Sequence, residues 1–365
     1  MRRLGLVFLA LVALAGALYG SAHLMTGSSG FARAVVWGES DIDDRHRFPA
    51  REIEAGAYVW RLPRAPARLG LDGFLERRST RAFVVLHHGR VVYERYFNGG
   101  SREELETSFS VAKSFVSTLI GIAIEEGAIR GLDEPVTRRL PELEERDPRF
   151  ARISIRDLLS MSSGLRYEED GMPWSDDTVT YYGADLRDVA LENTEVDQDP
   201  GLGFHYNNFN PLLLGLILER ATQMPVADYM ETRLWRPMGA EADGSWSLDS
   251  EGSGFEKMES GVNARARDLA RYGLLMLRQG RAHGRRVVSP AWVRAATTGD
   301  GPYGLGWWLT PRSRAGQEAF LARGKYGQVI AVDRANDAVV VRLGSDEAGV
   351  DWGTLALEVA GDLDP

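Results

Sequence analysis

Short runs rich in β-branched and other apolar residues occur near both ends of the chain and predict β-strands there. The β-rich runs 82–87 and 90–96 flank the turn residues His88 and Gly89 and together indicate a hairpin. A short turn also joins the last two of three strands that are expected near the C-terminus, and hairpins without crossover helices indicate an antiparallel sheet. These three strands are 303–309, 328–333 and 338–343.

The middle of the chain has helical periodicity. Apolar residues recur at helical spacing across 110–126, and Gly127 ends that helix. Asn210 and Pro211 are typical of a cap and a first helical residue. Further helices are expected at 153–161, 211–222 and 352–360. The pattern predicts an α+β fold, with a central antiparallel sheet built from both chain ends, flanked by helices, and an inserted helical region.

The first 25 residues have the pattern of an export signal. Arg2 and Arg3 precede an uncharged apolar run at 4–20, and small residues at 20–22 would allow cleavage. A helix over this run would rise about 26 Å, slightly less than the roughly 30 Å hydrocarbon core of a bilayer. A cleaved signal peptide and an uncleaved membrane anchor both stay open. Either one places the rest of the chain outside the cytoplasm, in the periplasm or another extracytoplasmic compartment.

Residues 26–69 have no sustained period and are expected to form a linker and an irregular lead-in, followed by one domain at 70–365.

Composition and the absence of several motifs exclude some classes of protein. A net charge of −9 argues against binding to nucleic acid. The sequence has no Cys, which excludes disulfides and Cys-based metal sites, and its six His have no metal-ligand spacing. It also has no Gly-x-Ser-x-Gly elbow, phosphate loop or His-Glu-x-x-His motif.

The first chemical motif is the Ser-x-x-Lys of Ser110 and Lys113, at the start of the predicted helix 110–126. Residues three apart share a helix face, so the hydroxyl and the amine are expected to meet. A Ser hydroxyl becomes a nucleophile when a base takes its proton, and burial favours the neutral amine that a Lys needs for this role. Lys occurs at only two other positions, 257 and 325, and apolar neighbours predict that Lys113 is buried. Alone, the motif also fits a helix cap followed by an exposed Lys.

Two further segments carry candidate chemistry. Tyr206 lies just before a predicted helix, and a Tyr beside a Lys ammonium can act as a general base, while the amide of Asn208 can donate to a substrate carbonyl. The stretch 322–328 is expected immediately before or on an edge strand, where Gly324 and Gly327 allow backbone to approach a ligand. An N–H group at such an edge is the usual second donor of an oxyanion hole. Each segment alone also fits an ordinary turn or strand entry.

In this order, the three motifs resemble those of the class C β-lactamase superfamily of penicillin-recognising serine hydrolases. The resemblance covers roughly residues 75–345 and is most similar to the 6-aminohexanoate-dimer hydrolase and esterase branch. The segments that resemble this branch are 41–49, 166–170 and 326–328. Further segments that agree with the superfamily are 155–165, 214–222, 234–240 and 303–308.

The resemblance implies a β-lactamase-like fold and an acyl-enzyme on Ser110, with Lys113 and Tyr206 as the general acid/base pair. The N–H groups of Ser110 and Lys325 would stabilise the oxyanion, and no metal or organic cofactor is needed. The remaining candidate residues for substrate binding or the oxyanion hole are Asn208, Gly324 and Tyr167. Asn208 would also orient Lys113.

The third motif departs from the family pattern Lys-Thr-Gly-x-x-Gly. Its glycines superpose on Gly324 and Gly327 only if Ala322 takes the place of the Lys, so that Lys325 contributes a backbone N–H alone. The missing Lys normally recognises the carboxylate of a β-lactam or a D-Ala peptide, although Arg323 could partly substitute. The resemblance thus implies hydrolysis of a small-molecule ester or linear amide. A β-lactamase or D-Ala peptidase, and a non-catalytic ligand-binding member of the fold, are the alternatives.

Overall fold

The computed structural model describes residues 29–363 except 68, 170, 171, 173 and 312–318, together with scattered positions between 5 and 20. The expected export signal or anchor at 1–25, including the apolar run 4–20, therefore lies largely outside the described residues. Within the described part of the chain, no helix combines the length and the apolar character needed to cross a membrane.

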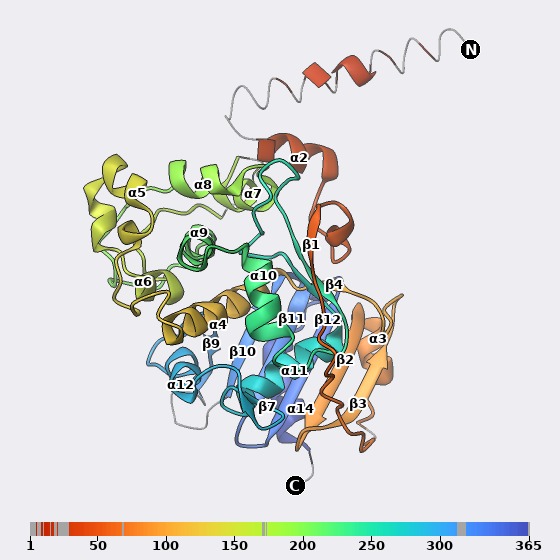
Figure 1. The fold of residues 1–365 in the computed structure, drawn as a ribbon. Helices are drawn as coiled ribbons and strands as arrows, with labels where there is room; N and C mark the ends of the chain where they lie inside the picture. Colours follow the sequence, from red (N-terminus) through yellow and green to blue (C-terminus); the bar gives the residue numbers. More distant parts are fainter. Residues whose placement is uncertain are drawn as a thin grey trace.

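A six-stranded antiparallel sheet forms the centre of the molecule, in the order β3-β2-β12-β11-β10-β9 (Figure 1). Strands from the two ends of the chain meet where β2 pairs with β12, which confirms the predicted sheet. The strands are β2 (Thr80–His87), β3 (Arg90–Tyr96), β9 (Trp308–Leu309), β10 (Ala319–Gly324), β11 (Gln328–Asp333) and β12 (Ala338–Gly344).

Helices cover both faces of this sheet because side chains alternate along each strand. In β2, Val84 points into the larger apolar core with α11, whereas Val85 points into a smaller core with α14. The inserted helical region, with α4 through α9, lies beside the sheet (Figure 1). The helices are α2 (Ser29–Trp37), α3 (Asp72–Arg77), α4 (Ala112–Glu125), α5 (Pro141–Arg146), α6 (Ile155–Leu159), α7 (Asp176–Tyr182), α8 (Leu186–Glu192), α9 (Phe209–Thr222), α10 (Val226–Met230), α11 (Ala266–Leu277), α12 (Pro290–Thr297) and α14 (Trp352–Gly361).

A second, four-stranded antiparallel sheet in the order β1-β5-β6-β4 holds the start of α4 in place. Its strand β4 ends three residues before Ser110, and the N–H of Ser108 continues the pairing by donating to Val262 O at 2.9 Å. The remaining strands are β1 (Ala50–Ile53), β4 (Glu106–Thr107), β5 (Gly244–Ser247), β6 (Val262–Ala264) and the hairpin of β7 (Arg281–Ala282) and β8 (Arg285–Arg286).

Short helical turns complete the chain. One of them, η2, contains Ser110, and another, η6, directly follows β10. The 3-10 turns are η1 (Asp44–His46), η2 (Phe109–Val111), η3 (Val136–Arg138), η4 (Pro148–Arg152) and η6 (Lys325–Gly327), and η5 (Glu231–Trp235) is a π-helical turn.

The structure differs from the predicted elements at three places. The stretch 26–69 is not wholly irregular, since it contains α2 and the strand β1, which pairs with β5 from far along the chain. The predicted strand 303–309 is reduced to Trp308–Leu309, because Gly306 has a φ of +80° that breaks an extended run.

The third difference concerns the helix expected at 211–222. It begins at Phe209, whose N–H donates to Asn207 Oδ1 at 2.8 Å, so Asn210 lies inside the helix and is not its cap. Pro211 still falls within the first turn, where its missing N–H has no partner to lose.

Candidate active site

Ser110 and Lys113 meet as the sequence predicts. Lys113 Nζ lies 2.8 Å from Ser110 Oγ and donates to Glu259 O at 3.0 Å. Lys113 is 3% exposed, which confirms its predicted burial. The amine therefore has a hydroxyl on one side and a carbonyl acceptor on the other. This arrangement lets a neutral amine donate to Glu259 O while its lone pair faces the Ser110 hydroxyl.

The backbone before Ser110 is tightly constrained. Phe109 has a φ of +48°, a conformation that is rare for a bulky residue and is often found at functional sites. The end of β10 lies against this turn, and a Cβ placed on Gly324 would be 2.5 Å from Ser108 O. Only a glycine lets the two segments approach this closely, which explains the glycine that the sequence places at 324.

Tyr206 lies directly beside Lys113. Lys113 Nζ is 4.9 Å from the centroid of the Tyr206 ring. Trp308 stacks on the same ring, with the two centroids 5.5 Å apart. Among these described residues, no hydrogen bond joins the Tyr206 hydroxyl to Ser110 or Lys113. The structure thus brings Tyr206 to the pair through its ring face.

Asn208 and Tyr167 form a pair of their own. Asn208 Nδ2 donates to Tyr167 Oη at 2.7 Å, and Glu259 O takes the place expected of Asn208 as the partner of Lys113. Tyr167 is buried in the core, where burial raises the pKa of its hydroxyl well above the usual value, and it does not line the cavity described below. In this structure Tyr167 therefore supports Asn208 from behind, and its contact with a substrate stays a prediction.

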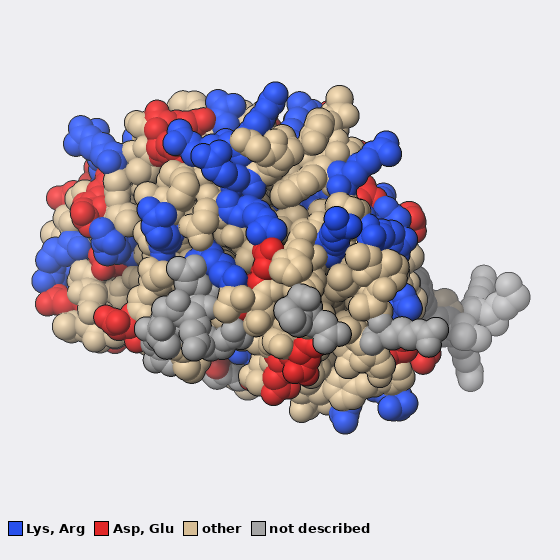
Figure 2. All heavy atoms as spheres, turned by 90° about the horizontal axis from the view of Figure 1, so that it is seen from below, with Lys and Arg blue, Asp and Glu red and all other residues tan. Residues whose placement is uncertain are grey.

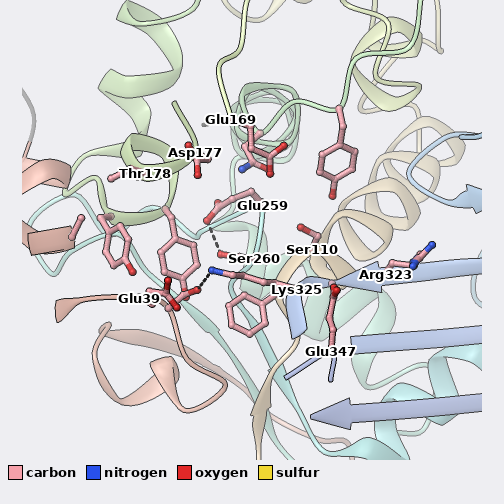
Figure 3. A pocket seen from close by; sticks show the side chains of 18 of the residues that line it. Glu39, Ser110, Glu169, Asp177, Thr178, Glu259, Ser260, Arg323, Lys325 and Glu347 are labelled. Carbon is pink, nitrogen blue, oxygen red and sulfur yellow. Dashed lines mark hydrogen bonds between the residues drawn. The ribbon is translucent and has the colours of Figure 1, made fainter. Parts of the chain in front are cut away.

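The third motif reaches the site through the turn after β10. Gly324 and Lys325 both line the cavity, but Lys325 Nζ donates to Ser40 Oγ at 2.8 Å, in the lead-in. Ala322 is buried in the larger core. Arg323 forms an ion pair with Asp351 at 3.1 Å and extends away from Ser110 (Figure 3).

A cavity of about 690 Å³ opens over Ser110. Residues from α2, α7, η2, the 206–208 turn and the end of β10 line it, and Glu39, Glu169, Asp177, Glu259 and Glu347 supply carboxylates around it (Figure 3). Lys and Arg side chains are instead spread over much of the face that Figure 2 shows. The surroundings of Ser110 are therefore acidic.

Sequence reasoning missed a cluster of buried charges next to this cavity. Lys257 is 1% exposed and lies 3.1 Å from Glu259 Oε1, and burial lowers the pKa of its amine. Tyr181 lies beside it, half-buried in the cavity lining, and donates to Asp44 Oδ2 at 2.6 Å. Burial raises the pKa of the Tyr181 hydroxyl, and Asp44 raises it further. The one available signal was the scarcity of Lys in the sequence, which singles out Lys257 but does not indicate where in the fold it lies.

No metal site accompanies this arrangement within the described part of the chain, where no group of three or more His, Asp or Glu could hold an ion. The groups that surround Ser110 are an amine, a phenol ring, carboxylates and backbone amides. They are suited to proton transfer and to binding a polar substrate.

Known proteins with similar sequences point to the same chemistry. The family model described as Beta-lactamase matches residues 71–360. The 6-aminohexanoate-dimer hydrolase of Paenarthrobacter ureafaciens is 32% identical over 326 residues, which cover 82% of this chain and 80% of that protein. Esterase EstB of Burkholderia gladioli is 32% identical over 197 residues, covering 48% of this chain and 50% of the esterase.

Solved structures show the same fold. A Bacillus anthracis protein provisionally assigned as a 6-aminohexanoate-dimer hydrolase has a TM-score of 0.77 at 24% identity, covering 87% of this chain and 92% of that one. A class C β-lactamase has a TM-score of 0.60 at 18% identity, covering 81% and 94%. With the family match over 71–360, these likenesses establish that the chain belongs to the beta-lactamase family and is a serine hydrolase with the β-lactamase-like fold.

Proposed function

We propose that this protein cleaves an ester or linear amide bond through an acyl-enzyme on Ser110. The observation that carries the proposal is the 2.8 Å contact between Lys113 Nζ and Ser110 Oγ, at the base of a cavity large enough for a small molecule. Nucleophile and base within hydrogen-bond distance, with the base held by a third group, is the usual arrangement for covalent catalysis. Here the third group is Glu259 O.

In the first step the Lys113 amine takes the proton of Ser110 as Oγ bonds to the substrate carbonyl carbon. The negative charge that develops on the carbonyl oxygen is stabilised by the N–H groups of Ser110 and Lys325. The intermediate then collapses, the C–N or C–O bond breaks, and Tyr206 protonates the leaving amine or alcohol while it takes a proton from Lys113. The contact of Lys113 Nζ with the Tyr206 ring, 4.9 Å from its centroid, supports this pairing.

In the second step water attacks the acyl carbon and gives its proton to the Lys113–Tyr206 pair. The bond from the carbon to Oγ breaks, Ser110 regains its proton, and a carboxylic acid leaves. No atom in this sequence comes from outside the substrate, water and the three side chains.

The charges around the cavity favour one class of substrate. Five carboxylates line the cavity, of which Glu259 is paired with Lys257. The cationic side chains Arg323 and Lys325 also line it, but Arg323 is paired with Asp351 and Lys325 donates to Ser40 Oγ. Ala322, in the place of the family's Lys, offers no charge for a substrate carboxylate. We therefore favour a neutral or amine-bearing ester or linear amide. The 6-aminohexanoate-dimer hydrolase relative is named for a linear amide whose amine, but not its carboxylate, suits these charges. A β-lactamase or D-Ala peptidase is the second candidate, and the family match supports it.

The test combines labelling with a substrate panel. Mass spectrometry of protein treated with a fluorophosphonate should place the adduct on Ser110, and Ser110→Ala should lose both the adduct and hydrolysis while it keeps its melting temperature. A panel of short-chain esters, linear amides with and without a terminal amine, and nitrocefin then ranks the substrates. An adduct on another Ser, with Ser110→Ala still active, would contradict the mechanism. Absence of any labelling or turnover would favour a non-catalytic, ligand-binding protein.

A further inference from the structure

A second lysine is buried close to the Ser110–Lys113 pair, and the proposed mechanism does not use it. Lys257 Nζ lies between two aromatic rings, 4.4 Å from the centroid of Phe48 and 4.2 Å from that of Tyr181. It forms an ion pair with Glu259 Oε1 at 3.1 Å, and both side chains are 2% exposed. The amine also donates to Tyr181 O. The lysine is thus held by Phe48 and Tyr181, from two distant parts of the chain, and by Glu259 from its own segment.

Such a pair is poorly explained by stability alone. Removing two charges from water is costly, and apolar residues of similar volume often stabilise a fold equally well. A buried ion pair does, however, fix the orientation of its two side chains, because few arrangements satisfy both charges. The Lys257–Glu259 pair is therefore better explained by the orientation that it gives to Glu259.

The pair determines where the carbonyl of Glu259 points. Glu259 Oε1 accepts from Ser260 Oγ at 2.6 Å (Figure 3) and is also held by Lys257. The carbonyl of the same residue accepts from Lys113 Nζ at 3.0 Å. With its side chain fixed at one end, Glu259 has little freedom to rotate its backbone. The carbonyl is consequently kept where it can orient the Lys113 amine towards Ser110.

A second connection runs from Lys257 through Tyr181 to the nucleophile. The Tyr181 ring stacks on Phe109, with centroids 6.3 Å apart and planes 19° apart, and Phe109 is the residue with positive φ directly before Ser110. Asp44 fixes the other end of Tyr181 through the 2.6 Å hydrogen bond to its hydroxyl. Lys257 therefore contacts the supports of both members of the reacting pair.

We infer that Lys257 is a positioning residue, which aligns Lys113 through Glu259 and Ser110 through Tyr181 without touching the substrate. The inference rests on the proposed function of Ser110 and Lys113. Misplacing a reacting group by about 1 Å can cost on the order of 100-fold in rate, so the loss of this support should be visible in turnover.

The experiment compares Lys257→Met with Arg267→Met in the full chain. Arg267 is a matched control, since it is also buried and forms a 3.1 Å ion pair, with Glu94, and it does not line the cavity. For Lys257→Met we expect kcat on a short-chain ester to fall about 10- to 100-fold with KM changed less than about threefold, and fluorophosphonate labelling of Ser110 to slow by the same factor. For Arg267→Met we expect a lower melting temperature and unchanged kcat below it.

Two outcomes would overturn the inference: a folded Lys257→Met with wild-type kcat, or an increase in KM alone, which would indicate a substrate contact. If Lys257→Met does not fold, Glu259→Gln gives the same test, because it keeps the backbone carbonyl and the side-chain size but removes the charge that pairs with Lys257. Unchanged kcat in that variant also overturns the inference. Labelling of wild-type protein at Ser110 separates this failure from a failure of the proposed function, which would leave the wild type unlabelled.

Discussion

Lys325 Nζ donates to Ser40 Oγ at 2.8 Å, so its side chain is bound to the lead-in and does not extend towards Ser110. The neighbouring Tyr326 is held in the same way, since its hydroxyl donates to Ser40 O at 2.6 Å. The turn after β10 is therefore fixed by a segment far from it in the sequence. This geometry favours the register in which the backbone of Lys325, and not its amine, serves the reaction.

The first prediction tests that register. Lys325→Ala keeps the backbone N–H, so kcat/KM on a neutral ester should change less than tenfold, or about 1.4 kcal/mol of transition-state stabilisation. Ser40→Ala is the matched control, because it breaks the same contact from the other side. Steady-state kinetics on both variants checks this. A loss of more than a hundredfold for Lys325→Ala, in a protein that melts normally, would show that the amine itself takes part.

Gly324→Ala should be far more damaging than either of those changes. A Cβ at this position would lie 2.5 Å from Ser108 O and 3.2 Å from the Cβ of Phe109, so β10 must move away from the nucleophile turn. Displacing one oxyanion donor typically costs about 10²–10³ in turnover, and we expect a loss of that size. Gly361→Ala, where an added Cβ meets nothing within 4 Å, should leave kcat unchanged. Equal activity of the two variants would argue against the close approach at Gly324.

A third prediction concerns the dependence of stability on pH. Burial raises the pKa of Glu241, but Arg102 and Arg271, each 2.5 Å from one of its carboxylate oxygens, lower it to about 2. A carboxylate with a lowered pKa in the folded state stabilises the fold above its ordinary pKa, and this contribution is lost as the pH falls towards 2. Glu241→Gln should therefore destabilise the protein by on the order of 3 kcal/mol at pH 7.

Urea unfolding at pH 7 and pH 3 measures this effect. The difference between wild type and Glu241→Gln should narrow at the lower pH, and an equal difference at both values would contradict the assignment. Glu52→Gln, at an exposed position of β1, controls for the loss of one negative charge.

The fourth prediction concerns the N-terminal segment, which we propose directs export. Cells that express the full chain should hold the enzyme outside the cytoplasm, either processed near residue 22 or attached to the membrane. A chain without residues 1–25 should stay in the cytoplasm with unchanged kcat, because the described residues that line the cavity all lie at position 34 or later. Fractionation with N-terminal sequencing distinguishes these results. Full-length enzyme that is soluble in the cytoplasm with an intact N-terminus would contradict export.

Sequence patterns predicted the local parts of the site and missed the long-range ones. The contact between Ser110 and Lys113 follows from their spacing on one helical turn, and it is present. The carbonyl of Glu259 could not be foreseen, because it reaches Lys113 only through the pairing of β4 with β6, across 146 positions of sequence. The candidate Tyr167 rested on the family resemblance of the segment 166–170, which does not reveal that its hydroxyl accepts from Asn208 Nδ2 inside the core.

The fold shows the same division between local and long-range features. The hairpin of β2 and β3 and the strands β11 and β12 are runs rich in β-branched and other apolar residues, and they form as predicted. The strand β1 carries only four residues, and its partner β5 lies almost two hundred positions away, so nothing in its own pattern marks it. Its pairing depends on tertiary contacts that periodicity does not record.

The part of the chain that forms the site begins earlier than the part that matches the family model, because the lead-in contributes to the site. The family match begins at residue 71, yet Ser40, Asp44 and Phe48 contact Lys325, Tyr181 and Lys257 beside the cavity. A chimera joined at residue 71 would inherit the sheet and the nucleophile from one parent and this wall of the site from the other. We therefore expect exchange of the lead-in between related enzymes to alter what they accept as substrate while the reaction itself is retained.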